Sequence, residues 1–161
     1  MPADRDSGAD SATVSLRRHF DCDFADLWEA VSSPGSVSAW FTPCRLEPDR
    51  RYSLRFTEDS GETHVKYATV LDCRRRGSVG EYRLLLQDEG YSDSTVEVRV
   101  GAAARTGSTL ELRHLHPPPE LADGYARGWA DYLDCLRRHL AAAPPVPADA
   151  AAATRRAGGP K

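Results

Sequence analysis

The chain has 161 residues, of which 40% are hydrophobic and 28% are charged, and its formal net charge is −3. This length suits one globular domain, and the near balance of charge produces no overall field that would attract nucleic acid or a membrane surface. We therefore expect a single domain, with no nucleic-acid partner and no membrane association.

Residues 13–143 carry the apolar periodicity expected of a folded domain. Residues 1–12 and 144–161 are polar or rich in Ala and Pro, which predicts disordered tails. The chain starts without an apolar signal segment and contains no run of apolar residues long enough to cross a membrane, so a cytoplasmic location is expected. The four cysteines are scattered without a Cys-x-x-Cys pair, a pattern that predicts neither a zinc site nor a redox pair, and we expect no cofactor.

The first elements of the domain are a strand and two short helices. Residues 13–20 alternate apolar with polar side chains, as a half-buried strand does. Residues 24–31 place their large apolar side chains on one helical face. The pair Ser33 and Pro34 is typical of a helix start, and it predicts a second helix that ends near Phe41.

Five further stretches alternate apolar and polar residues, and turn residues separate them. The stretches are residues 51–57, 62–72, 82–86, 95–100 and 108–114. Short connections between them favour antiparallel hairpins with one apolar face, which another element must cover.

Residues 120–143 provide that covering element. Their apolar side chains recur at steps of three and four, which predicts a helix of about 22 residues that would span roughly 33 Å. The residues of its apolar face are Leu121, Tyr125, Trp129, Tyr132, Leu133, Leu136 and Leu140. We expect Leu121 and Leu140 to be plain core, and the middle of the face to lie over a ligand.

This order of elements resembles the START-like superfamily of helix-grip domains, also called SRPBCC domains, and within it the family of activators of heat-shock-protein ATPase homologues. The similar motifs are at residues 20–22, 27–31, 33–34, 39–41, 109–114 and 125–133. The resemblance implies an α+β fold in which a curved antiparallel sheet of about six or seven strands wraps around the long C-terminal helix. Two short helices would follow the first strand.

Two positions within the resemblance are informative. The pair Gly128 and Trp129 is the most specific motif, because a glycine in mid-helix costs roughly 1 kcal/mol and requires a reason, either close helix packing or space for a ligand. The chain departs from the family at Arg50 and Arg51, where relatives commonly carry two glycines, so the turn at Asp49 must be made differently.

The resemblance also implies a cavity between sheet and helix, which holds an apolar small molecule in related proteins. Strand alternation adds the inward positions, among which we expect Val65 and Leu110 as well as the ligand contacts themselves. The predicted ligand-binding residues are Phe56, Tyr67, Tyr82, Leu84, Val98, Leu112, His114, Tyr125, Trp129 and Leu133.

Three functions are compatible with these residues. The favoured one is binding of an apolar or aromatic small molecule. The second is a cyclase- or aromatase-like enzyme that uses His114 as general base and a tyrosine as acid, although His114 is equally compatible with a buried structural role and no carboxylate is expected beside it on the inner face. The third, by analogy with the family, is a chaperone-associated protein-interaction module whose partner is unknown.

Overall fold

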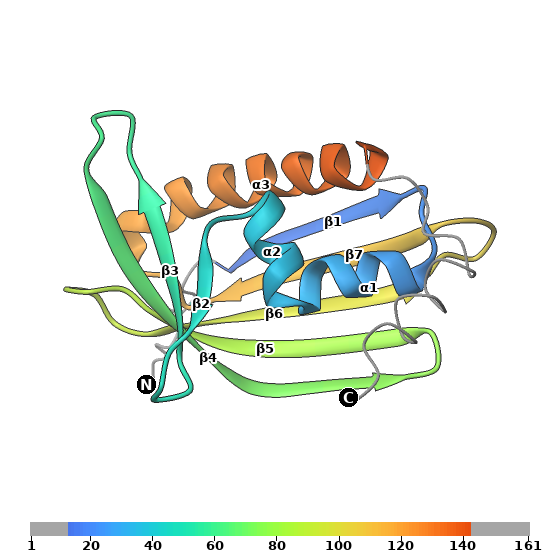
Figure 1. Cartoon of the computed structure of the whole chain (residues 1–161), viewed down its shortest axis with the longest axis horizontal. Coiled ribbons are helices and arrows are strands. Elements are labelled where there is room, and N and C mark those ends of the chain that lie inside the picture. The colour runs from blue at the N-terminus through green and yellow to red at the C-terminus, as the bar shows by residue number, and fades with distance from the viewer. Residues whose placement is uncertain (1–12, 143–161) are drawn as a thin grey trace, which may run out of the picture.

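A seven-stranded antiparallel sheet and a long C-terminal helix form the body of the protein (Figure 1). The structure is a computed structural model and describes residues 13–142, so the predicted tails at 1–12 and 144–161 lie outside the described residues. The strands are β1 (Val14–Phe20), β2 (Cys44–Leu46), β3 (Tyr52–Thr57), β4 (Thr63–Arg76), β5 (Val79–Gln87), β6 (Ser94–Ala102) and β7 (Ser108–Leu115). The helices are α1 (Phe24–Ser32), α2 (Pro34–Trp40), the 3-10 turn η2 (Pro119–Leu121) and α3 (Ala122–Ala142).

The strand order is β1-β7-β6-β5-β4-β3-β2. Consecutive strands pair as hairpins from β2 to β7, and β1 returns to pair with β7 at the far edge. Figure 1 shows α3 lying along the sheet with α1 and α2 on the same side of it. The predicted helix-grip arrangement is therefore confirmed. The prediction missed β2, because three residues are too few to show alternation.

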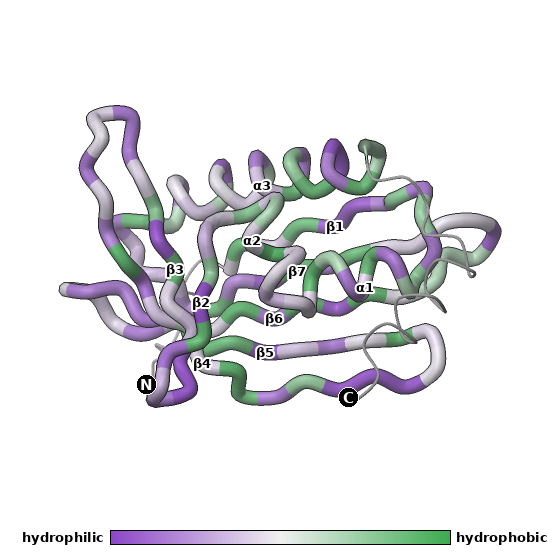
Figure 2. The backbone as a smooth tube through the Cα atoms, viewed as in Figure 1, coloured by the Kyte–Doolittle hydropathy of each residue, from purple (hydrophilic) through white to green (hydrophobic). Residues whose placement is uncertain are grey.

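The core fills the space between the helices and the inner face of the sheet. Alternation along β6 and β7 is strict: Val96, Val98 and Val100 are buried, as are Leu110 and Leu112 on the neighbouring strand. Figure 2 shows the corresponding alternation of hydrophobic and hydrophilic residues along the strands. The predictions for these strands are confirmed because each has one apolar face and one polar face.

The predicted face of β4 was wrong by one residue. Val65 and Tyr67 were expected to point inward, but register with β3 pairs Leu54 with Lys66 and places Lys66 and Ala68 on the inner face. Ala68 is 2% exposed, whereas Val65 is 37% exposed. Both alternating sets in this strand contain apolar residues, so its own pattern does not choose between them. The pairing of β4 with β3, where Leu54 is buried, decides which set faces inward.

The turn before β3 is made without glycine. Arg50 adopts a left-handed conformation with φ of 71°. The carboxylate of Asp49 accepts hydrogen bonds from the backbone N–H of Arg51 at 3.0 Å and from its Nε at 2.8 Å. These bonds, the backbone bond above all, lower the pKa of Asp49. An Asx-type turn therefore forms at Asp49 without a glycine pair.

Candidate functional site

A pocket of about 310 Å³ lies between α3 and the inner face of the sheet. Its walls come from the end of α2, four neighbouring strands, η2 and the first half of α3. Most of the lining is apolar or aromatic. The lining residues are Phe41, Leu54, Phe56, Lys66, Leu84, Leu86, Val96, Leu121, Gly124, Tyr125, Gly128, Trp129 and Tyr132.

Two glycines of α3 help to form this pocket. Gly124 and Gly128 lie one helical turn apart, and both line it. A Cβ added at either position would meet no atom of the described residues within 4 Å. Close packing of helix on sheet is therefore not the reason for Gly128. The missing side chains instead widen the pocket.

A second cavity of about 130 Å³ lies deeper, under α2. Phe41 and Trp129 line both cavities, and their rings stack with centroids 5.6 Å apart and planes at 21°. Phe41 also contacts Tyr132 edge-on, with centroids 4.5 Å apart. The pair of Phe41 and Trp129 therefore forms a wall between the two cavities.

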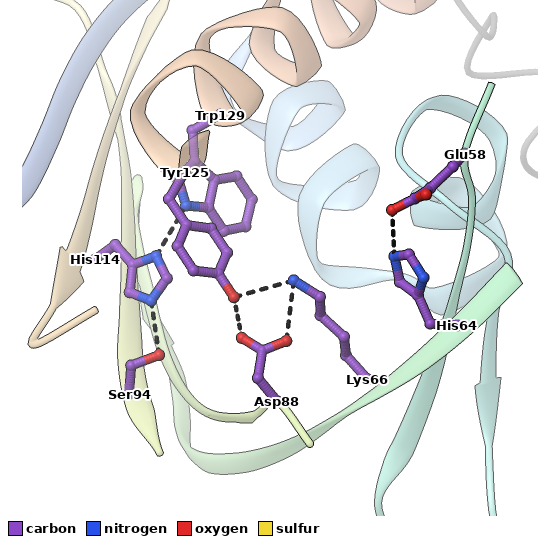
Figure 3. Close-up of polar contacts among 8 residues, drawn as sticks. All are labelled: Glu58, His64, Lys66, Asp88, Ser94, His114, Tyr125 and Trp129. Carbon is purple, nitrogen blue, oxygen red and sulfur yellow. Dashed lines mark hydrogen bonds and ion pairs between the residues drawn. The ribbon is translucent and has the colours of Figure 1, made fainter. Parts of the chain in front are cut away.

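Lys66, Asp88 and Tyr125 form a polar cluster at one end of the apolar pocket, where their polar ends point toward one another (Figure 3). Lys66 Nζ lies 3.0 Å from Asp88 Oδ1 and donates to the Tyr125 hydroxyl, also at 3.0 Å. The Tyr125 hydroxyl donates in turn to Asp88 Oδ2. Burial, together with the hydrogen bond to Asp88, raises the pKa of Tyr125, so that the phenol keeps its proton. The Asp88 side chain is only 8% exposed, so this is a nearly buried ion pair.

A second set of hydrogen bonds joins the side chains of Ser94, His114 and Trp129. The indole Nε1 of Trp129 donates to His114 Nδ1 at 3.1 Å, and His114 Nε2 lies 2.7 Å from Ser94 Oγ. An indole can only donate, so Nδ1 must be the unprotonated nitrogen, and the neutral ring carries its proton on Nε2 and donates to Ser94. Burial lowers the pKa of His114 to about 4, although the nearby charge of Asp88 opposes the shift.

Antiparallel topology brings these side chains together. Lys66 lies near the start of β4 and Asp88 directly after the end of β5, while Ser94 starts β6 and His114 is near the end of β7. Because neighbouring antiparallel strands run in opposite directions, the start of one strand lies beside the end of the next. The four residues therefore lie at the same end of the strands. The N-terminal half of α3 crosses this end and adds Tyr125.

The structure brings most of the predicted ligand-binding residues to the two cavities, although their role in binding stays a prediction. Phe56 and Tyr125 line the first, Leu84 and Trp129 line both, and the second is also lined by Tyr82, Val98, Leu112 and Leu133. His114 is fully buried and contacts Tyr125 edge-on, with ring centroids 4.4 Å apart.

Three of the predicted positions differ. His114 lines neither cavity and contacts the lining residues Tyr125 and Trp129 from behind. Tyr67 lies under the guanidinium of Arg51, 4.1 Å from its Cζ, because the face of β4 was misassigned. Leu121 was expected to be plain core but lines the first pocket.

Sequence reasoning missed the polar cluster. The inner face was expected to hold no carboxylate near His114, yet Asp88 binds the Tyr125 hydroxyl that lies beside the imidazole. Asp88 precedes Glu89 and Gly90, so it looks like an ordinary turn residue. Lys66 lies between Val65 and Tyr67, and the inward prediction for these two residues left it out of the predicted site.

Within residues 13–142, no group of three or more His, Cys, Asp or Glu side chains is placed to hold a metal ion. No helix in the same part of the chain is long and apolar enough to cross a membrane. The polar groups that the pocket offers to a ligand are those of Lys66 and the aromatic side chains.

No protein-family model and no curated protein matches the chain. Several solved structures are similar to it. A protein from Nitrosomonas europaea has a TM-score of 0.65 at 16% identity, over 81% of this chain and 95% of its own. CalU16 from Micromonospora echinospora has a TM-score of 0.65 at 22% identity, over 81% of this chain and 76% of its own. DynU16, described as a protein of the dynemicin biosynthetic locus, has a TM-score of 0.59 at 18% identity, over 83% of this chain and 48% of its own.

At these identities the similarity shows the shared fold alone. The resemblance to activators of heat-shock-protein ATPase homologues therefore stays a prediction, while the helix-grip fold itself is confirmed.

Proposed function

We propose that the pocket beneath α3 binds an apolar or aromatic small molecule. The observation that carries this proposal is a cavity of about 310 Å³ with an almost entirely apolar lining, which two glycines of the covering helix leave open. Ligand pockets typically measure about 300 to 1,000 Å³ and combine such linings with a few placed polar groups. The location of DynU16 in a biosynthetic locus is consistent with a small-molecule role for this fold.

The hydrophobic effect would supply most of the affinity. Burial of apolar surface contributes roughly 25 cal/mol per Å², and the rings of Phe41, Phe56 and Trp129 offer faces and edges to an aromatic ligand. His114 accepts a hydrogen bond from the Trp129 indole, and this contact holds one wall of the pocket in place. We therefore assign His114 a positioning role in the proposed site.

The enzymatic alternative draws less support from this geometry. A general base needs an accessible lone pair. The Nδ1 lone pair of His114 already accepts the Trp129 N–H, and its Nε2 carries the proton that is donated to Ser94. The arrangement favours binding over acid–base catalysis.

Filling the pocket tests the proposal. Gly128→Leu places a side chain in the open space, and Gly35→Leu is a matched control because Gly35 is also a helical glycine whose added Cβ meets no atom of the described residues. The proteins would be mixed with a panel of fatty acids and aromatic polyketides and measured by native mass spectrometry and thermal shift.

Wild type and Gly35→Leu should retain a ligand, and their melting temperatures should rise when it is bound. Gly128→Leu should bind the same ligand at least about tenfold more weakly, a difference of roughly 1.4 kcal/mol in binding free energy. Circular dichroism would verify that each variant is folded. The proposal is overturned if wild type retains no member of the panel, or if the folded Gly128→Leu variant binds as well as the control.

A further inference from the structure

We propose that the ligand is a planar aromatic molecule without net charge that presents one oxygen acceptor, a carbonyl or phenol oxygen, to Lys66. This inference rests on the proposed binding function and specifies the class of ligand. It follows from the donors, the charge balance and the shape of the pocket.

The polar cluster leaves one donor for a ligand. An ammonium group has three N–H donors. Among the described residues, Lys66 Nζ forms an ion pair with Asp88 Oδ1 at 3.0 Å and donates a hydrogen bond to the Tyr125 hydroxyl, so these two oxygens occupy at most two of the three donors. The Tyr125 proton is already donated to Asp88. Because Lys66 lines the pocket, its third N–H is a charged donor that a bound molecule would meet, beside the phenol of Tyr132 in the same lining.

Charge balance selects a neutral oxygen. Within the described part of the chain, Lys66 is the only charged residue of the pocket lining, and Asp88 directly behind it neutralises its charge. A carboxylate ligand would bring an uncompensated negative charge next to Asp88 in a largely apolar site, which is costly. A pure hydrocarbon would offer Lys66 no oxygen acceptor and would leave its ammonium only the faces of Phe56 and Tyr125, whose centroids lie 5.2 and 4.7 Å from Nζ, so it would gain no hydrogen bond from the site.

The shape of the walls favours a flat molecule. Phe41 and Trp129 present stacked rings, and Phe56 meets Phe41 edge-on with centroids 5.8 Å apart. Opposite the sheet, Gly124 and Gly128 leave a strip of helix without side chains. Aromatic pairs prefer offset-stacked or edge-to-face arrangements, and these walls offer surfaces for both.

Three naphthalenes of equal shape test the inference. 2-Acetylnaphthalene carries a neutral oxygen, 2-ethylnaphthalene carries none, and 2-naphthoate carries an anionic carboxylate. Their dissociation constants for the wild-type protein would be measured by quenching of tryptophan fluorescence and by calorimetry. We expect 2-acetylnaphthalene to bind about tenfold more tightly than 2-ethylnaphthalene, and more tightly than 2-naphthoate.

Two variants and one control test whether Lys66 and Asp88 cause the preference for 2-acetylnaphthalene. Lys66→Met keeps the length of the side chain and removes the donor, so it should bind the acetyl and ethyl compounds equally. Asp88→Asn removes the compensating charge, so its affinity for 2-naphthoate should rise relative to 2-acetylnaphthalene. Arg83→Met, on the outer face of the sheet where Arg83 pairs with Glu97, loses the same charge as Lys66→Met and should keep the wild-type order.

The inference is overturned, with the binding function intact, if wild type binds the acetyl and ethyl compounds equally, if it binds 2-naphthoate most tightly, or if it binds fatty acids but none of the naphthalenes. It is also overturned if the affinity of folded Asp88→Asn for 2-naphthoate does not rise relative to its affinity for 2-acetylnaphthalene. If wild type binds neither the naphthalenes nor the fatty acids and polyketides, the binding function itself fails. Because the decisive comparison uses the wild-type protein, it does not depend on the folding of Lys66→Met.

Discussion

At the scale of single residues, His114 shows how one hydrogen-bond donor sets the protonation of a buried ring. The Trp129 indole points its N–H at Nδ1, and a protonated imidazole would place a second N–H against it. The ring is 0% exposed, so water cannot solvate the charged form. Both effects favour the neutral state and keep the Ser94–His114–Trp129 chain in one arrangement.

This arrangement predicts a loss of stability in mild acid. The folded-state pKa of His114, about 4, lies below the ordinary value of 6.5, so between these pH values the unfolded chain binds more protons than the folded one. The free energy of unfolding should therefore be unaffected by this group above pH 6.5. As the pH falls from 6.5 to 4 it should decrease by up to about 3 kcal/mol. Urea denaturation across this range measures the effect.

His114→Asn separates this group from the carboxylates that also titrate in acid. Its amide oxygen can accept the Trp129 N–H without taking up a proton, so the slope of stability against pH between 6.5 and 4 should flatten. An unchanged slope in His114→Asn would assign the pH dependence to other groups.

At the scale of elements, Trp28 docks α1 onto the sheet. Its ring packs on the backbone of Gly80 in β5, where an added Cβ would come within 2.5 to 2.8 Å of three ring atoms. The same ring stacks on Phe24 with centroids 6.3 Å apart, and it contacts Tyr82 at 6.1 Å. A strand residue without a side chain is therefore what lets the helix approach.

Gly80→Ala should destabilise the protein by about 1 to 3 kcal/mol, because the methyl group overlaps the Trp28 ring. Gly101→Ala, on the neighbouring strand, is the matched control, since its added Cβ meets only the Ser78 carbonyl at 3.9 Å. The midpoint of urea denaturation compares the two. If Gly80→Ala costs as much in a Trp28→Ala background as in wild type, the clash is not the cause.

At the scale of the whole molecule, Phe41 connects three elements around the pocket, α2, α3 and β3. It caps α2, stacks on Trp129 of α3 and meets Phe56 of β3 edge-on. These contacts divide the interior under the helices into two cavities of about 310 and 130 Å³. If the first pocket binds a ligand as proposed, we expect the position of this ring to limit the size of that ligand.

Phe41→Ala should join the two cavities at a cost of about 3 kcal/mol in stability, near the lower end for buried aromatic residues because Phe41 is half-buried. We expect the variant to gain affinity for longer fatty acids and four-ring aromatics relative to wild type in native mass spectrometry. Val37→Ala enlarges the second cavity alone and should not change the size preference. An unchanged size limit in folded Phe41→Ala would show that the wall does not control access.

The fold class, most of the element positions and most of the apolar residues that line the two cavities were predictable from local patterns in the chain. Period-two alternation in β6 and β7 and the helical stripe of α3 each report which side of one element is buried, and this information is local to the element. Tyr82, Leu84, Val98, Tyr125 and Trp129 were found in this way.

Only the tertiary structure decided the polar part of the site. Lys66 and Tyr125 are 59 positions apart in the chain, and their hydrogen bond depends on strand order, on the register of β3 with β4, and on where α3 crosses the sheet. Each of these is a relation between elements, and the periodicity of a single strand carries no information about such relations. The face of β4 shows the same limit: its own residues were compatible with either orientation, and the buried Leu54 on the next strand decided between them.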